Sequence, residues 1–326
     1  MRAWLRRWCW PIGKLLLALA IVLAVGRRFY LDLQHLNTEN LSLRPGWLVL
    51  SAILYVLALG FSAWFWYRLM VFFGAEPGGL GVVRAYYIGH LGKYVPGKAW
   101  SVLLRSALIL PYGVRLGVGA ITGFYEVLTT MAAGALLAAA IFLIQPPEVP
   151  GLSWNPVFTG LLLLVLLGLP LLPGVFNRLI SRLAARFQHV ESFRLPPLGH
   201  ATLASGLLAT SCGWLLLGVS LWAMLQAVLP DPPDLSVPHL AHLIASLGLA
   251  YVAGFLAIVV PGGIGVREIF LLELIGRHGS DEAIYAMAIL ILRLVWTATE
   301  LIVAAIVYWF PRPLAKTPPT REEIEN

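Results

Sequence analysis

Near its C-terminal end the chain reads Val260-Pro261-Gly262-Gly263-Ile264-Gly265-Val266-Arg267-Glu268. One proline and three glycines break a helical pattern there, and an adjacent arginine–glutamate pair follows at once. A second break, Tyr94-Val95-Pro96-Gly97-Lys98-Ala99-Trp100, lies 165 residues earlier, with Arg105 beyond it. Both breaks interrupt apolar sequence, so their backbone and charges need protein or a water-filled cavity around them.

The composition indicates a membrane protein. Hydrophobic residues make up 59% of the chain and charged residues only 12%, against about 25% charged in an average soluble domain. Several windows reach about 20 apolar residues, the length that crosses a bilayer core of roughly 30 Å. The net charge of +7 comes from basic residues in the connections, as cytoplasmic loops require, so we expect no nucleic-acid partner.

The first 26 residues allow two interpretations. Four basic residues precede the apolar run Leu15–Val25, as in a secretory signal peptide. The run extends back through Trp8-Cys9-Trp10, however, which favours an uncleaved first span with a cytoplasmic N-terminus. Five further spans are predicted at 47–70, 116–144, 157–172, 203–229 and 283–310. The most basic connection follows the fourth span, and 177–187 is predicted to be an amphipathic interfacial helix.

The segments around the two breaks are predicted to be re-entrant hairpins. The arms 80–95 and 98–110 would be about 24 and 20 Å long as helices, too short to cross a bilayer comfortably. Residues 239–260 could span alone, which would leave the second break at the inner surface. Alternatively they form the long arm of a hairpin that enters from outside and returns through 264–276. The positive-inside rule favours the hairpin, because it keeps the basic C-terminal tail in the cytoplasm.

The predicted fold is therefore all-α and polytopic, with six full spans plus two hairpins, or eight spans if the hairpins are counted. Residues 1–326 form a single transmembrane domain, with 311–326 as a flexible tail. The order span, hairpin, span occurs at 47–144 and again, inverted, at 203–310. Glu126 lies 30 residues after Pro96, and Arg293 lies 32 residues after Pro261. Inverted repeats with broken helices recur in transporters, with the substrate site where the repeats meet.

The breaks supply candidate substrate-binding residues. A broken helix exposes N–H groups and the positive end of its dipole, which suits an anion, and arginine binds phosphate bidentately. A plain cytoplasmic turn would instead expose the same charges to solvent or headgroups. The candidates are Lys98, Arg105, Pro261, Gly262, Gly263, Arg267 and Glu268.

Three more ionisable residues lie well inside predicted spans: Glu126, Arg293 and Glu300. Such a group costs at least a few kcal/mol unless it is paired or wet. The matched positions of Glu126 and Arg293 predict an ion pair across the repeat axis, which would either gate the cavity or simply lock the bundle. Arg293 and Glu300 are about 10 Å apart along one helix face, with Thr297 between, so we expect one polar stripe without direct contact. No catalytic constellation, metal site or cofactor motif emerges, and we expect no enzyme.

The two breaks resemble motifs of the lysylphosphatidylglycerol synthase transmembrane region family, which is also described as flippase-like. The matching pieces are Gly92–Trp100 followed by Arg105, and Val260–Glu268. Glu126 and Arg293 fall where that family carries a glutamate and an arginine in membrane helices. Val127 departs from the family, which often has arginine directly after the glutamate.

The resemblance implies a flippase-like protein of the cell inner membrane that moves lipid between leaflets. The aminoacyl-lipid synthases carry a cytosolic transferase after this domain, and the present chain stops at Asn326, so aminoacylation is not expected. The implied ligand is an anionic, glycosylated or polyprenyl-phosphate lipid. The alternative is a non-transporting accessory subunit that presents such a lipid to a separate lipid-modifying enzyme or glycosyltransferase.

Overall fold

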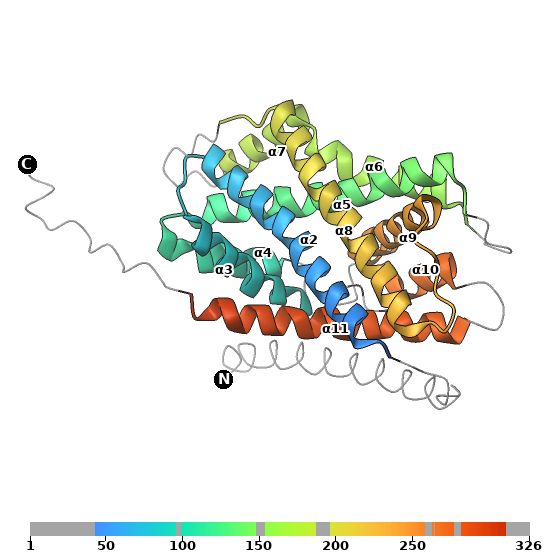
Figure 1. Cartoon of the computed structure of the whole chain (residues 1–326). Helices are drawn as coiled ribbons and strands as arrows, with labels where there is room; N and C mark the ends of the chain where they lie inside the picture. The colour runs from blue at the N-terminus through green and yellow to red at the C-terminus, as the bar shows by residue number, and fades with distance from the viewer. Residues whose placement is uncertain are drawn as a thin grey trace, which may run out of the picture.

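The computed structural model describes residues 43–95, 99–147, 154–186, 196–257, 263, 265–276 and 282–310. These ranges contain ten α-helices and no strand (Figure 1). Short 3-10 turns, η2, η3 and η4, extend three of the helices. The elements are α2 (Pro45–Phe72), α3 (Gly79–His90), η2 (Leu91–Tyr94), α4 (Trp100–Ile109), η3 (Leu110–Tyr112), α5 (Leu116–Ile144), α6 (Pro156–Gly168), η4 (Leu169–Leu171), α7 (Pro173–Arg186), α8 (His200–Val228), α9 (Val237–Leu256), α10 (Val266–Ile275) and α11 (Glu282–Tyr308).

Long apolar helices form the framework. The helices α2 and α8 pack against each other along much of their length, and the Ser51 and Ser220 hydroxyls lie 2.8 Å apart between them. The central helix α5 contacts α2, α6, α8 and α9. The Trp214 indole on α8 donates to the Thr130 carbonyl on α5 at 2.7 Å. These contacts fix the helices on which the interior charges lie.

The helices beside each break form antiparallel pairs. At the start of α3, Gly81 lies against the ring of Tyr112, just after α4. Towards the break, Gly92 approaches Ser101 so closely that a Cβ would come within 2.7 Å of its Cα. In the second pair His242 on α9 lies 3.0 Å from the Leu274 carbonyl on α10. The segments predicted as hairpin arms are thus helices that run alongside each other in pairs, all of them short except α9, which has 20 residues.

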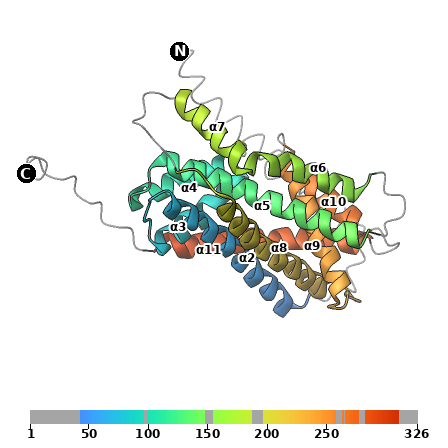
Figure 2. The ribbon, with the colours of Figure 1, turned by 90° about the horizontal axis from the view of Figure 1, so that it is seen from above.

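The two helix pairs approach α11 from opposite ends (Figures 1 and 2). The α3 residue Arg84 donates from Nε to the Tyr308 carbonyl, at the C-terminal end of α11, at 3.4 Å. The outer end of α10 instead meets the segment before α6, where the Trp154 indole donates to Glu273 at 2.9 Å. Both breaks therefore point towards the middle of α11.

Within the described ranges, five helices are long and apolar enough to cross a membrane: α2, α5, α8, α9 and α11. Four of them match the spans predicted at 47–70, 116–144, 203–229 and 283–310, while α9 meets the same criterion by its length. The predicted span 157–172 is only the 16 residues of α6 and η4, and the chain bends by 56° into α7. The first predicted span and the tail 311–326 lie outside the described residues.

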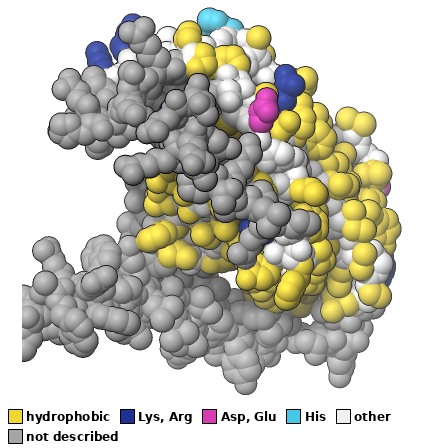
Figure 3. Space-filling view, turned by 90° about the vertical axis from the view of Figure 1, so that its left-hand side faces the viewer, with side chains coloured by type: hydrophobic (Ala, Val, Ile, Leu, Met, Phe, Trp, Pro, Cys, Tyr) yellow, Lys and Arg dark blue, Asp and Glu magenta, His cyan; other side chains and the backbone are white. Residues whose placement is uncertain are grey.

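Large apolar side chains cover the outside of this bundle. Leu143, Phe158 and Leu208 are each about two-thirds or more exposed, which water would penalise and lipid tails would not. The described part of the face in Figure 3 is mostly hydrophobic, and its charges gather near the upper margin. The protein is a multi-pass membrane protein.

Candidate functional site

A closed ion pair joins α4 to α5. The Arg105 guanidinium donates from Nη1 to Glu126 Oε2 at 2.8 Å, and both side chains are only 2% exposed. The Tyr86 and Thr130 hydroxyls each donate to Glu126 Oε1 at 3.2 Å. Rings cover the guanidinium, with its Cζ 4.8 Å from the Tyr86 centroid and 5.4 Å from that of Trp66.

This enclosure argues against Arg105 as a headgroup ligand. A phosphate would have to enter between the rings and displace a carboxylate that other groups also hold. Arg105 Nε has no hydrogen-bond partner among the described residues, so the guanidinium is held mainly by one carboxylate oxygen and the rings. The structure thus pairs Arg105 with Glu126 in a closed environment, and the role in binding a phosphate that the sequence suggested stays a prediction that this enclosure disfavours.

A second, more open group of charges lies where the two helix pairs meet α11. We call it the junction cluster. One face of α11 contributes Arg293, Thr297 and Glu300, at spacings of four and three residues; Arg293 contacts Glu268, whereas Thr297 and Glu300 both contact Tyr94. The remaining members come from α2, from the first break and from the N-terminal turn of α10, namely Tyr55, His90, Lys93, Tyr94, Arg267 and Glu268.

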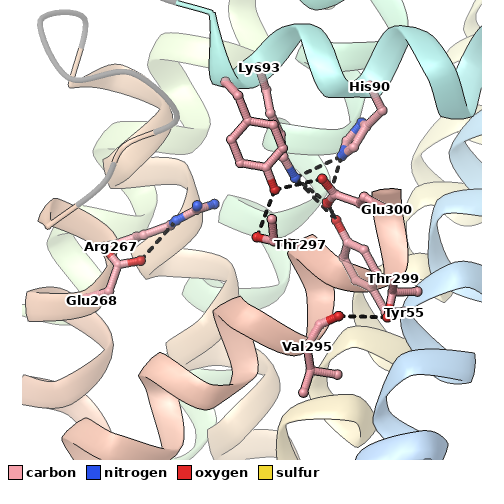
Figure 4. Close-up of polar contacts among 10 residues, drawn as sticks. Tyr55, His90, Lys93, Arg267, Glu268, Val295, Thr297, Thr299 and Glu300 are labelled. Carbon is pink, nitrogen blue, oxygen red and sulfur yellow. Dashed lines mark hydrogen bonds and ion pairs between the residues drawn. The ribbon is translucent and has the colours of Figure 1, made fainter. Parts of the chain in front are cut away.

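Glu300 gathers the groups of the first break (Figure 4). Its Oε1 accepts from the Lys93 ammonium and from the Tyr55 hydroxyl. Its Oε2 accepts from Tyr94 at 2.8 Å, and the Tyr94 hydroxyl lies 2.9 Å from that of Thr297. The Glu300 side chain is 2% exposed, whereas Lys93 is 24% exposed. The lysine thus reaches from a partly open position to a buried carboxylate.

Glu268 organises the second break in the same manner. Its Oε1 accepts from Arg293 Nη1 and, at 3.3 Å, from Arg267 Nε. Its Oε2 accepts from the Gly265 N–H at the N-terminus of α10. The positive end of this helix, which the sequence offered to a ligand, is therefore already held by a carboxylate of the chain itself. The fractional exposures are 11% for Arg267, 15% for Arg293 and 20% for Glu268.

Aromatic rings connect the two halves of the junction cluster. The Arg267 guanidinium lies 4.5 Å from the Tyr251 ring centroid, and Tyr251 lies 5.8 Å from Trp296. Trp296 stacks on Tyr55 at 4.4 Å, and Tyr55 bonds to Glu300. In Figure 4 the Arg267 side chain extends from α10 towards the side of Thr297 and Lys93. The cluster is one continuous site, built from both breaks.

The formal charges favour an anion there. Among the described residues the cluster has three Lys and Arg side chains, Lys93, Arg267 and Arg293, against two carboxylates, Glu268 and Glu300, which leaves a formal excess of one positive charge. A charge at membrane depth is stabilised by an ion of opposite sign. No group of three or more His, Cys, Asp or Glu side chains that could hold a metal ion occurs in the described ranges.

The predicted pair between Glu126 and Arg293 is wrong. Each residue pairs locally instead, Glu126 with Arg105 and Arg293 with Glu268, because α5 packs on α4 and α11 packs on α10. In both pairs a long helix contributes one charge and the short helix before it contributes the other. The expected polar stripe of Arg293, Thr297 and Glu300 is present; Arg293 binds Glu268, whereas Glu300 binds Tyr94.

The glycine-rich break is described only in part. Gly263 has φ +68°, a conformation that favours glycine, and a Cβ would lie 2.7 Å from the Gly254 carbonyl oxygen. It therefore allows the break to pack closely on α9. Lys98, Pro261 and Gly262 lie outside the described residues.

Several cluster members are not among the candidate site residues chosen from the sequence. Lys93 and His90 were visible as cations just before the first break, and their nearness to Pro96 was the available signal. Tyr55 lies in the middle of α2, and Tyr251 in α9, where an isolated tyrosine looks like any other apolar-facing residue. Only the packing of α2 and α9 near α11 brings these rings to the cluster.

An apolar groove elsewhere on the molecule carries no such chemistry. It lies between α2 and α8, has a volume of about 520 Å³, and is lined by Leu57, Gly60, Phe61, Trp64, Ser205, Leu208, Ala209 and Cys212. Because it lacks charged groups, we assign the candidate site to the junction cluster and not to this groove.

Comparison with known proteins identifies the family. No curated protein matches the chain. The lysylphosphatidylglycerol synthase TM region family matches residues 13–304, which include every helix of both breaks and nearly all of α11. Since this match covers most of the chain, the protein belongs to the lysylphosphatidylglycerol synthase TM region family.

Proposed function

We propose that the protein is a flippase-like protein of the inner membrane that translocates or presents a lipid with an anionic headgroup. The lipid class is an anionic, glycosylated or polyprenyl-phosphate lipid. The observation that carries the proposal is the junction cluster, in which both breaks bring an excess cation to the middle of an apolar bundle. The proposal assigns no catalytic step and no cofactor to the chain.

The proposed inverted repeat is supported by the helix contacts. If α2, α3, α4 and α5 are exchanged with α8, α9, α10 and α11, contacting pairs map onto contacting pairs. The contact of α3 with α11 corresponds to that of α9 with α5, and α2 with α11 corresponds to α8 with α5. We propose that the two helix pairs are re-entrant hairpins, the first from the cytoplasm and the second from outside.

The proposed binding step is an exchange of partners. Without ligand, Glu268 and Glu300 neutralise most of the cationic charge, which avoids a strongly uncompensated cluster. A headgroup phosphate would take over hydrogen bonds from Arg267 and Lys93, whose side chains are 11% and 24% exposed. Lys98, Pro261 and Gly262 remain in the proposed site from the sequence. The closed Arg105–Glu126 pair would stay intact and hold α4 on α5.

Lipid mass spectrometry on gently purified protein tests the binding part. We expect one class of anionic lipid to be enriched over its share of the membrane with wild type and lost with Arg267→Gln. Arg68→Gln is a matched control, since Arg68 is exposed on α2 and belongs to no cluster contact. Bulk phospholipid in membrane proportions for all three proteins would contradict the proposal.

The presenting role is separated from translocation by a second measurement. A lipid that is retained but never changes leaflet, together with stable co-purification of a lipid-modifying enzyme or glycosyltransferase, would favour the accessory subunit. Transfer between leaflets by the purified chain alone would favour the flippase.

A further inference from the structure

The helix α7 presents a surface that the proposed transport site does not use. It follows α6 and η4 after a bend of 56°, so it leaves the direction of the apolar segment at the point where that segment ends (Figure 2). Its sequence, PGVFNRLISRLAAR, contains three arginines and no acidic residue. A basic helix that turns aside at the end of an apolar segment is well placed to meet lipid headgroups.

Three rows of side chains run along α7. Phe176 and Ile180 face the bundle, with Phe176 2% exposed and 4.5 Å from the ring of Tyr125 on α5. The next row, Val175 and Leu179, is apolar, yet these side chains are 43% and 42% exposed. The third row consists of Arg178 and Arg182, which are both exposed. Each arginine follows a member of the exposed apolar row by three residues.

The order of these rows around α7 follows the change from apolar to charged groups at a bilayer surface. The buried row packs on the bundle, and the exposed apolar row needs an apolar neighbour such as acyl chains. The arginines lie on the far side of the apolar row, at the level where lipid phosphates lie. The N-terminal half of α7 is held in place, because the Asn177 side chain forms two 3.0 Å hydrogen bonds with the backbone N–H and carbonyl of Leu198. The helix can thus hold its arginines at a set depth.

We propose that α7 docks on an anionic lipid leaflet, with Arg178 and Arg182 bound to headgroup phosphates and Val175 and Leu179 among the upper acyl chains. Each arginine near an anionic surface raises the affinity for that surface about fivefold at low salt. This interaction is independent of any lipid held in the junction cluster. The charge rule then assigns this end of α6 to the cytoplasmic side.

A spin label on α7 tests the docking. In the full chain with Cys9 and Cys212 changed to serine, a nitroxide is attached at Leu179→Cys, and its access to oxygen and to a water-soluble nickel chelate is measured. The nanodiscs contain phosphatidylcholine alone or a 3:1 mixture with phosphatidylglycerol. We expect the label to be shielded from nickel in the mixed discs. A label at Ser181→Cys, on the exposed polar side, should remain open to nickel.

The arginines are tested by substitution within the same assay. Arg178→Gln with Arg182→Gln should raise nickel access at position 179 severalfold in the mixed discs. The control, Arg68→Gln with Arg115→Gln, removes two exposed arginines elsewhere and should change nothing. If the double variant does not fold, 1 M NaCl added to the labelled protein that keeps both arginines must raise nickel access at position 179 by the same amount. A label that is open to nickel in both lipids, or shielded equally with and without phosphatidylglycerol and salt, would overturn the proposal.

Discussion

At the residue scale, the two ion pairs between a break and its following helix differ in enclosure. Arg105 and Glu126 are both 2% exposed, while Glu268 and Arg293 are 20% and 15% exposed. A fully desolvated pair has little net effect on stability, yet removing one partner is costly, because the other charge stays buried alone. The first pair should therefore determine stability, whereas the second should determine ligand binding.

Glu126→Gln tests the structural pair. The substitution leaves the Arg105 guanidinium buried without a counter-charge, so we expect a loss of about 3–5 kcal/mol in the free energy of unfolding. Replacing both, as Arg105→Met with Glu126→Gln, should recover much of this loss. The measurement is detergent unfolding followed by tryptophan fluorescence. An unfolding midpoint for Glu126→Gln equal to that of wild type would contradict the assignment.

At the element scale, each break depends on how closely its helices approach. Gly263 combines φ +68° with a position against the Gly254 backbone, so its α9–α10 pair leaves no room for a side chain there. The helices themselves were predictable from hydropathy, since apolar runs bounded by proline and glycine specify where each one starts and stops.

Gly263→Ala should therefore destabilise the second break. We expect a cost of about 1–3 kcal/mol, from the left-handed backbone and from overlap with the Gly254 carbonyl. Gly46→Ala is the matched control, because Gly46 lies in the first turn of α2 with no atom within 4 Å of the added Cβ. That change should be neutral or slightly stabilising. Equal midpoints for the two variants in the same unfolding assay would show that the break tolerates a side chain.

If the two helix pairs enter the membrane from opposite sides, as proposed, they should be labelled from opposite sides. In the cysteine-free background, Leu80→Cys at the start of α3 should react with an impermeant maleimide only after the inner face is exposed. Glu273→Cys near the end of α10 should react in intact cells, because that end meets the segment before α6. Labelling of both positions from one side would remove the inverted arrangement.

At the scale of the whole molecule, the sequence predicted the class of fold but not the pairing of charges. The spacing of 30 and 32 residues singled out Glu126 and Arg293, which lie on α5 and α11, but the ion pair predicted between them does not form. Their partners depend on which helices pack together, and no interval along one chain states that. Tyr55 and Tyr251 show the same limit, because their place beside the junction cluster arises only from the packing of α2 and α9 near α11.

The central claim is that the junction cluster carries an anionic headgroup between leaflets. It is tested in proteoliposomes of phosphatidylethanolamine and phosphatidylglycerol (3:1) that contain a trace of NBD-labelled phosphatidylglycerol, by the rate at which inner-leaflet label becomes reducible by dithionite. We predict that wild type and Arg68→Gln accelerate this rate equally. Arg267→Gln should lower it roughly tenfold or more, as loss of a charge-assisted hydrogen bond worth about 1.5–3 kcal/mol implies. Equal rates for wild type and Arg267→Gln, or no acceleration by wild type, would contradict the account.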